Sequence, residues 1–122
     1  MPVATTELAP GYRISRLLRG GWQLAGGHGV IEAERAIADM AAFLDAGITA
    51  FDCADIYTGV EELIGRFRAR LAAERGQGAL RALKVHTKLV PDLAVLPRID
   101  RGYVTKIVDR SLARLRAERL DL

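Results

Sequence analysis

Three residues of the types that carry acid–base chemistry follow two short apolar segments of the chain. Asp52 ends residues 48–52, Tyr57 comes five residues after Asp52, and Lys88 lies at the end of residues 83–89. In parallel α/β folds, functional groups gather at the carboxyl ends of the strands, because the loops there are free to carry them. We therefore expect an acid, a phenol and an amine to converge at one end of a sheet.

This combination suggests proton transfer to a carbonyl oxygen. A free phenol has a pKa of about 10 and donates poorly at neutral pH, but a neighbouring ammonium favours its ionised form. Lys88 would make Tyr57 a competent acid and Asp52 would hold Lys88 in place, while a hydride reaches the carbonyl carbon. The same residues also fit a structural ion pair beside a buried tyrosine, and the spacing alone leaves both interpretations open.

Hydrophobic periodicity predicts the elements that would position these side chains. It indicates three successive units, each a strand followed by a helix. The spacing between strands, roughly 32 to 36 residues, is that of a βα unit with parallel strands. The expected strands are residues 16–24, 48–52 and 83–89, with a fourth opening at 120–122, and the expected helices are residues 32–46, Val60 to Leu71 with fraying through 75–78, and Val104 to Leu115.

The repeated unit predicts an α/β fold, the N-terminal portion of a (β/α)8 TIM barrel. Such a barrel needs about 250 residues, so about three βα units and the start of a fourth strand fit into this chain. We expect residues 1–122 to form an incomplete barrel domain, with residues 1–15 as a polar lead-in closed by a turn at Pro10 and Gly11. A compact doubly wound sheet is the alternative.

Three sequence motifs resemble motifs of the aldo-keto reductase family. Taken in order, they extend the resemblance over nearly all of the chain beyond Gly11. They are FDCADIY at residues 51–57 with Glu61 and Gly65 after it, the pair Thr87 and Lys88, and GGW at residues 20–22. The resemblance implies an NADP(H)-dependent oxidoreductase in which Asp52, Tyr57 and Lys88 are three of four catalytic residues. It also implies that Gly21, Trp22 and Asp52 lie beside the nicotinamide, and that the substrate is a small aldehyde, ketone or sugar.

The sequence departs from the family pattern at three places. Cys53 stands where the family often has threonine, and Thr58 precedes Gly59 where a glycine usually comes first. The family's catalytic histidine follows a Leu-Asp-Leu-like opening of strand four, and the chain ends at Leu122, before that position. We therefore expect residues 1–122 to be inactive alone. The alternative function is a non-catalytic half-barrel that associates with itself or a complementary fragment through open sheet edges.

The remaining aromatic and nucleophilic side chains have simpler explanations. His86 faces the same side as Lys88 but one layer deeper, which favours an interior, hydrogen-bonded histidine over a catalytic one. His28 lies in a glycine-rich loop and could line a substrate entrance or simply be a polar loop residue. Trp22, the only tryptophan, could also belong to the core. Cys53 is expected to be inert packing.

Composition and glycine spacing exclude several other classes. Eighteen Lys and Arg against 15 Asp and Glu give a net charge of +3 without a basic run, so no nucleic-acid partner is expected. The arginine-rich helix near the carboxyl end is interrupted by Asp109 and Glu118, which indicates a solvated outer face. Neither a dinucleotide fingerprint nor a P-loop is complete, because Glu32 and His28 occupy positions that those motifs need.

Cysteine count and hydropathy predict the compartment. One cysteine permits no intrachain disulfide and no cysteine-based zinc spacing, so no metal site is expected. The first fifteen residues lack a basic segment followed by an apolar one, and no stretch reaches about 18 apolar residues. We expect a cytoplasmic protein without a membrane segment.

Overall fold

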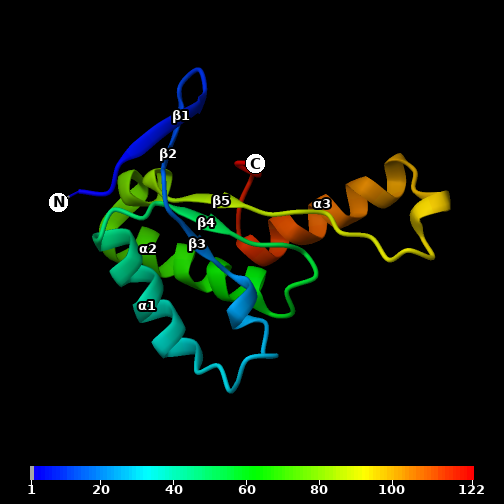
Figure 1. The fold of residues 1–122 in the computed structure, drawn as a ribbon, viewed down its shortest axis with the longest axis horizontal. Helices are drawn as coiled ribbons and strands as arrows, with labels where there is room; N and C mark the ends of the chain where they lie inside the picture. The colour runs from blue at the N-terminus through cyan, green and yellow to red at the C-terminus, as the bar shows by residue number, and fades with distance from the viewer. Residues whose placement is uncertain (1) are drawn as a thin grey trace.

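The computed structural model describes residues 2–122 of the protein. An antiparallel hairpin precedes a three-stranded parallel sheet that three helices cover (Figure 1). The strands are β1 (Thr5–Ala9), β2 (Tyr12–Ser15), β3 (Leu18–Gly20), β4 (Ala50–Asp52) and β5 (Lys84–His86), and the helices are α1 (Ala33–Asp45), α2 (Val60–Ala82) and α3 (Arg101–Leu115), with 3₁₀ turns at Trp22–Leu24 and Leu96–Arg98. The repeated strand–helix order confirms the predicted α/β class.

The register of the parallel sheet determines which side chains meet at its carboxyl end. Strand β4 lies between β3 and β5, and Asp52 pairs with His86. Backbone pairing continues beyond the strands, since Cys53 N donates to His86 O at 2.7 Å and Asp55 N donates to Lys88 O at 3.0 Å. Because side chains alternate along extended backbone, Asp52, His86 and Lys88 fall on the same face of the sheet.

The hydrophobic core lies between the opposite face of the sheet and the helices. The rings of Phe51 on β4 and Phe67 on α2 stack with their centroids 6.0 Å apart. Burying one such side chain contributes about 1.5–3 kcal/mol, so this layer is the main attachment of the helices to the sheet. Its members, each at most 3% exposed, include Ile37, Met40, Phe51, Ile64, Phe67, Leu71, Val85 and Leu115.

The helix boundaries confirm the predicted first helix and correct the second. Helix α1 begins after Glu32, whose carboxylate accepts hydrogen bonds from the backbone N–H groups of Glu34 and Arg35. It ends before Gly47, which adopts a positive φ of 90°. The expected fraying at residues 75–78 is partly realised, because Gly76 breaks the helix with a φ of 83° and a ψ of 179°, but a further helical segment then continues to Ala82.

The first parallel strand is shorter than predicted, and the polar lead-in has structure that its sequence did not reveal. Strand β3 ends at Gly20, and residues 22–24 form a 3₁₀ turn instead of continuing the strand. The predicted turn at Pro10 and Gly11 joins β1 to β2. Tyr12 on β2 anchors this hairpin to the sheet, since its hydroxyl lies 2.8 Å from His86 Nε2.

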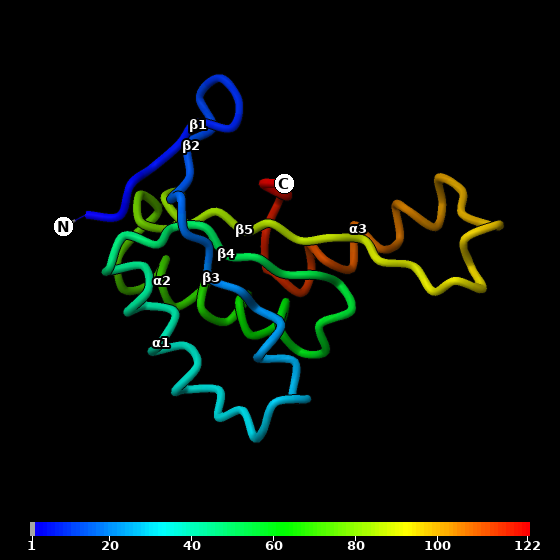
Figure 2. The backbone as a smooth tube through the Cα atoms, viewed as in Figure 1, coloured from blue at the N-terminus to red at the C-terminus, as the bar shows by residue number. Residues whose placement is uncertain are grey.

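The predicted opening of a fourth strand is only partly realised. Residues 120–122 are not a strand, yet Leu122 O accepts a hydrogen bond from Thr87 N at 3.1 Å. This contact places the end of the chain beside the extension of β5, as the trace in Figure 2 shows. The backbone of these residues therefore follows the position that a neighbouring strand would occupy.

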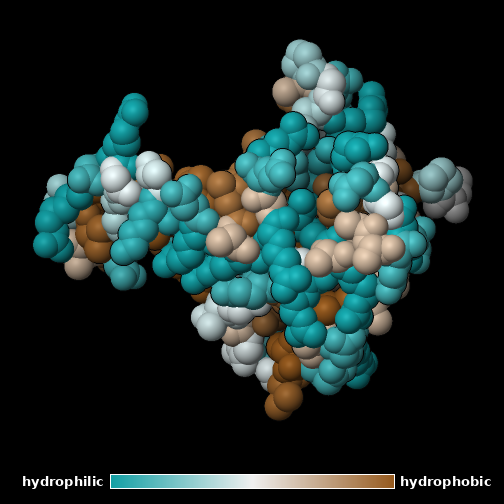
Figure 3. Space-filling view, turned by 180° about the vertical axis from the view of Figure 1, so that it is seen from behind, coloured by the Kyte–Doolittle hydropathy of each residue, from teal (hydrophilic) through white to brown (hydrophobic). Residues whose placement is uncertain are grey.

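Two apolar areas stand out on the face of the molecule that Figure 3 shows. Figure 1 shows that the β5–α3 connection and the start of α3 project away from the sheet. In Figure 3, brown surface gathers on this projecting arm and at the tip of the molecule formed by the loop before α1. Leu93 in the arm is 84% exposed and Val30 in the loop is fully exposed. No helix among residues 2–122 is long and apolar enough to cross a membrane.

Candidate active site

Asp52 and Lys88 form an ion pair at the carboxyl end of the sheet. Asp52 is the last residue of β4, and Lys88 follows the end of β5 by two residues. The Lys88 ammonium donates to Asp52 Oδ1 at 2.8 Å and to the backbone oxygen of Cys53 at 2.7 Å. Two acceptors hold the ammonium at this end of the sheet, and both side chains remain about half exposed.

Tyr57 comes to the same place from the β4–α2 loop. Its backbone N–H donates to Ala54 O at 3.1 Å, and its carbonyl accepts from Val60 N at 3.0 Å, so two turns shape the loop around it. Lys88 Nζ lies 5.5 Å from the centroid of the Tyr57 ring. This cation–π contact brings phenol, ammonium and carboxylate together, as the spacing predicted.

Gly21 and Trp22 adjoin this group from the end of β3. A Cβ atom on Gly21 would lie 2.6 Å from the backbone oxygen of Asp52, so only glycine permits this approach. Trp22 is 55% exposed, which excludes the alternative that it belongs to the core. Its ring meets that of His28 edge-on, with centroids 4.4 Å apart. The structure therefore leaves an aromatic side chain partly open at the residue that follows Gly21.

His86 and Cys53 have the structural surroundings expected of them. His86 is 7% exposed and is hydrogen-bonded to Tyr12, as an interior histidine should be. Burial lowers the pKa of His86 below its usual range. Cys53 is fully buried, and burial raises the pKa of its thiol to about 12. A thiol in this environment is a poor nucleophile at neutral pH.

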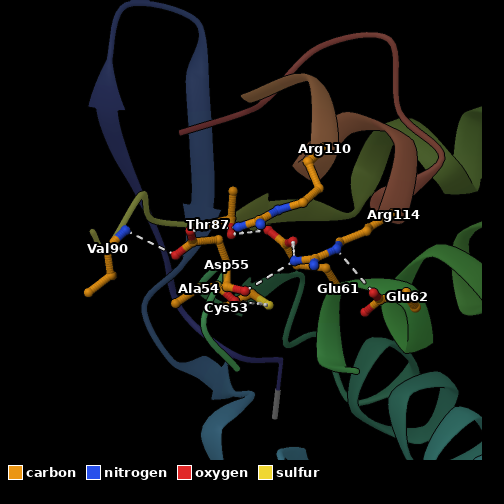
Figure 4. Close-up of polar contacts among 9 residues, drawn as sticks. All are labelled: Cys53, Ala54, Asp55, Glu61, Glu62, Thr87, Val90, Arg110 and Arg114. Atoms are coloured by element: carbon orange, nitrogen blue, oxygen red, sulfur yellow. Dashed lines mark hydrogen bonds and ion pairs between the residues drawn. The ribbon is translucent and has the colours of Figure 1, made fainter. Parts of the chain in front are cut away.

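A buried polar cluster behind the candidate site was not predicted from the sequence. Asp55 and Glu61 lie on either side of Tyr57 in the chain, and their side chains are 3% and 1% exposed. Arg110 and Arg114 of α3 pair with them, each at 3.2 Å (Figure 4). The interpretation of a solvated outer face holds for most of α3, where basic side chains such as Arg101 and Lys106 are exposed. Arg114 departs from it, because the buried carboxylates draw its side chain inward, whereas Arg110 pairs with Asp55 but stays 41% exposed. Periodicity gave no signal for these partners, which lie more than fifty residues away.

The two residues that follow Tyr57 line a groove, whereas Tyr57 itself does not. The groove has a volume of about 430 Å³ and lies between Thr58 and Gly59 on one side and Leu24 to Gly26 on the other. Among residues 2–122, no group of three His, Cys, Asp or Glu side chains is arranged to hold a metal ion.

The fold and the site together define a portion of a parallel α/β barrel with ionisable groups at the carboxyl ends of its strands. The family model of the aldo/keto reductase family matches residues 16–122. The chain belongs to this family.

Solved structures support the same fold. A Pseudomonas aeruginosa protein assigned as an aldo-keto reductase is 24% identical with a TM-score of 0.69, over 90% of this chain and 40% of that protein. A Bombyx mori aldo-keto reductase solved in complex with NADP is 21% identical with a TM-score of 0.75, over 98% of this chain and 36% of that protein. The chain thus spans less than half of either protein. No curated protein matches the sequence.

Proposed function

We propose that the protein, completed to a whole barrel, transfers a hydride reversibly between NADP(H) and the carbonyl carbon of an aldehyde, ketone or sugar. The observation that carries this proposal is the position of the Lys88 ammonium, 2.8 Å from Asp52 Oδ1 and 5.5 Å from the centre of the Tyr57 ring. Family membership of residues 16–122 supports the same chemistry.

Tyr57 is the general acid of this proposal. Within residues 2–122 its hydroxyl has no side-chain hydrogen-bond partner, so it is available to a substrate. In reduction the hydroxyl gives its proton to the carbonyl oxygen, and in oxidation it takes the proton back. Lys88 places its positive charge close to the phenol ring, and Asp52 keeps that charge in place.

The residues at the end of β3 fit a planar cofactor ring. NADP(H), when bound, supplies or accepts the hydride. Trp22 offers an exposed aromatic face beside Gly21, and Gly21 packs directly on the backbone of Asp52. We therefore assign Gly21, Trp22 and Asp52 to the nicotinamide end of the cofactor site. The NADP complex of the Bombyx mori relative supports the choice of cofactor.

The substrate class and the compartment are part of the proposal. Small carbonyl compounds or sugars suit a site of one phenol and one ion pair, since a carbonyl needs a proton donor on oxygen and little else from the protein. A single buried cysteine is compatible with the cytoplasm, where we place the activity.

The test is NADPH-dependent reduction of a panel of aldehydes, ketones and sugars by the full-length gene product and by its Tyr57→Phe variant. We expect the variant to lose at least about 10²-fold in kcat while it still binds NADPH, because only the proton donor is removed. Tyr103→Phe on α3 is the matched control and should keep normal turnover. Near-normal turnover of Tyr57→Phe would remove Tyr57 from its role.

The same preparation tests the association hypothesis. Strands β3 and β5 are the two edges of the parallel sheet among the described residues, and residues 120–122 already lie against the edge at β5. The edge at β3 could therefore pair with another chain. A protein without turnover on any substrate that forms defined oligomers in sedimentation experiments would favour association over catalysis.

A further inference from the structure

The buried cluster behind the candidate site connects the segments that carry Tyr57 and Lys88. Figure 4 shows side chains from the β4–α2 loop, the start of α2, the segment after β5 and helix α3 turned toward one another. Two of them, Asp55 and Glu61, are carboxylates that are almost completely buried. Burying a carboxylate costs several kcal/mol unless partners compensate, so their contacts need an explanation.

Glu61 uses both carboxylate oxygens. Oε1 accepts a hydrogen bond from Thr87 Oγ1 at 2.7 Å, and Oε2 accepts one from Arg114 Nη1 at 3.2 Å. The same Arg114 nitrogen donates to the backbone oxygen of Asp55 at 3.1 Å. Helix α3 thus joins the start of α2 to the loop before it, and Glu61 joins both to the residue preceding Lys88.

Asp55 makes the second connection between the same segments. Its Oδ1 accepts from Val90 N at 2.9 Å and its Oδ2 from Arg110 Nη2 at 3.2 Å. Its backbone N–H donates to Lys88 O at 3.0 Å. Val90 follows Lys88 by two residues, so this carboxylate holds the segment on the other side of the lysine.

These contacts have a common pattern. The two carboxylates flank Tyr57 in the chain, and the groups that they accept from flank Lys88. An acidic side chain near the start of a helix interacts favourably with the helix dipole, and the exposed Glu62 in the same turn already does so. This interaction therefore does not explain why Glu61 is buried. A pair of buried carboxylates that bridges two loops fixes the distance between those loops.

We infer that Asp55 and Glu61 are positioning residues that set the separation between the Tyr57 phenol and the Lys88 ammonium. The inference rests on the proposed function for its catalytic consequence, but the geometry concerns these two segments whatever the substrate. A misplacement of about 1 Å can cost about 10²-fold in rate, so loosening either bridge should reduce turnover.

The test uses Thr87→Val, because loss of Glu61 itself could prevent folding. Valine keeps the shape of threonine but cannot donate to Glu61. We expect kcat to fall at least about tenfold with NADPH affinity unchanged, and the Lys88 side chain to move away from the Tyr57 ring. Thr87→Ser should restore both. Thr105→Val, the same change at an exposed position of α3, should alter neither.

A measurement without substrate keeps the inference separate from the proposed function. Nuclear Overhauser contacts between the Lys88 side chain and the Tyr57 ring, assigned with Tyr57→Phe, should weaken in Thr87→Val and return in Thr87→Ser. If the wild-type protein reduces no carbonyl compound, the proposed function fails, while these contacts still decide the inference. A lower melting temperature with unchanged Lys88–Tyr57 contacts and unchanged kcat would reduce the cluster to a purely structural role and overturn the inference.

Discussion

Replacing Gly65 by alanine should have two opposing effects on stability, because helix α2 lies very close to helix α3 at this residue. Gly65 lies on α2, and a Cβ atom there would overlap the backbone oxygen of Arg114 and lie 3.1 Å from its carbonyl carbon. Replacing glycine by alanine inside a helix normally stabilises by about 0.5–1 kcal/mol. At Gly65 the obstacle is backbone, which cannot move aside as a flexible side chain can.

The destabilising clash should outweigh the gain in helix propensity. Overpacking a well-filled contact costs typically about 1–3 kcal/mol, and a clash with helix backbone belongs at the upper end of that range. After the gain in helix propensity is subtracted, Gly65→Ala should lower the free energy of unfolding by about 2 kcal/mol. Since about 1 kcal/mol shifts the melting temperature by about 2–8 °C in domains of roughly 60–250 residues, the shift should be easily measured.

The control is Gly78→Ala, in the helical segment that follows the break at Gly76. A Cβ atom at Gly78 meets no atom within 4 Å, so this variant should show only the propensity gain and melt at or slightly above the wild-type temperature. Urea and thermal unfolding of the three proteins, followed by circular dichroism, compare the two sites directly. If Gly65→Ala were as stable as Gly78→Ala, the argument from close packing of α2 on α3 would be refuted.

Three further predictions concern the titratable groups around the sheet. Lys88→Met should reduce kcat about 10²-fold with NADPH affinity kept, because the phenol loses its charged neighbour; near-normal turnover would contradict the role of Lys88. Burial lowers the pKa of His86, so the unfolded chain takes up this proton first as the pH falls, and the free energy of unfolding should decrease below about pH 6.5. Urea midpoints at pH 7.5 and 5.5 should show a smaller decrease for His86→Gln than for the wild type, and equal decreases would count against this assignment. Burial raises the pKa of Cys53 to about 12, so a maleimide at pH 7 should label the native protein far more slowly than the urea-unfolded chain, and equal rates would show that the thiol is accessible.

The parts of the fold that local patterns determine were predictable from the sequence. Helix α1 was expected at residues 32–46 and is Ala33–Asp45, because its apolar spacing and Gly47 both act within a few residues. The carboxyl ends of neighbouring parallel strands were also expected to bring Asp52 and Lys88 together, and the structure puts their charged atoms 2.8 Å apart. Such predictions succeed because a repeat period already fixes where side chains point.

The parts that depend on distant partners were not predictable. The hairpin of β1 and β2 has few buried residues of its own, and its attachment through Tyr12 to His86 joins residues 74 apart. The inward contacts of Arg110 and Arg114 likewise need Asp55 and Glu61, which no periodicity connects to α3. Charge patterns on a helix identify a polar face, but they do not show whether water or a buried carboxylate covers it.

Two levels of structure therefore position the three candidate catalytic groups, and they differ in how they can fail. Sheet register positions Asp52 and Lys88, and a register shift by one residue would turn both away from the site. Tyr57 lies in a loop with no ladder to hold it, so its place depends on turns and on the contacts of Asp55 and Glu61. Those contacts in turn need α3 close to α2, which the absence of a side chain at Gly65 permits. Helix α3 contributes no residue to the candidate site, yet its packing against α2 governs the distance between the phenol and the ammonium.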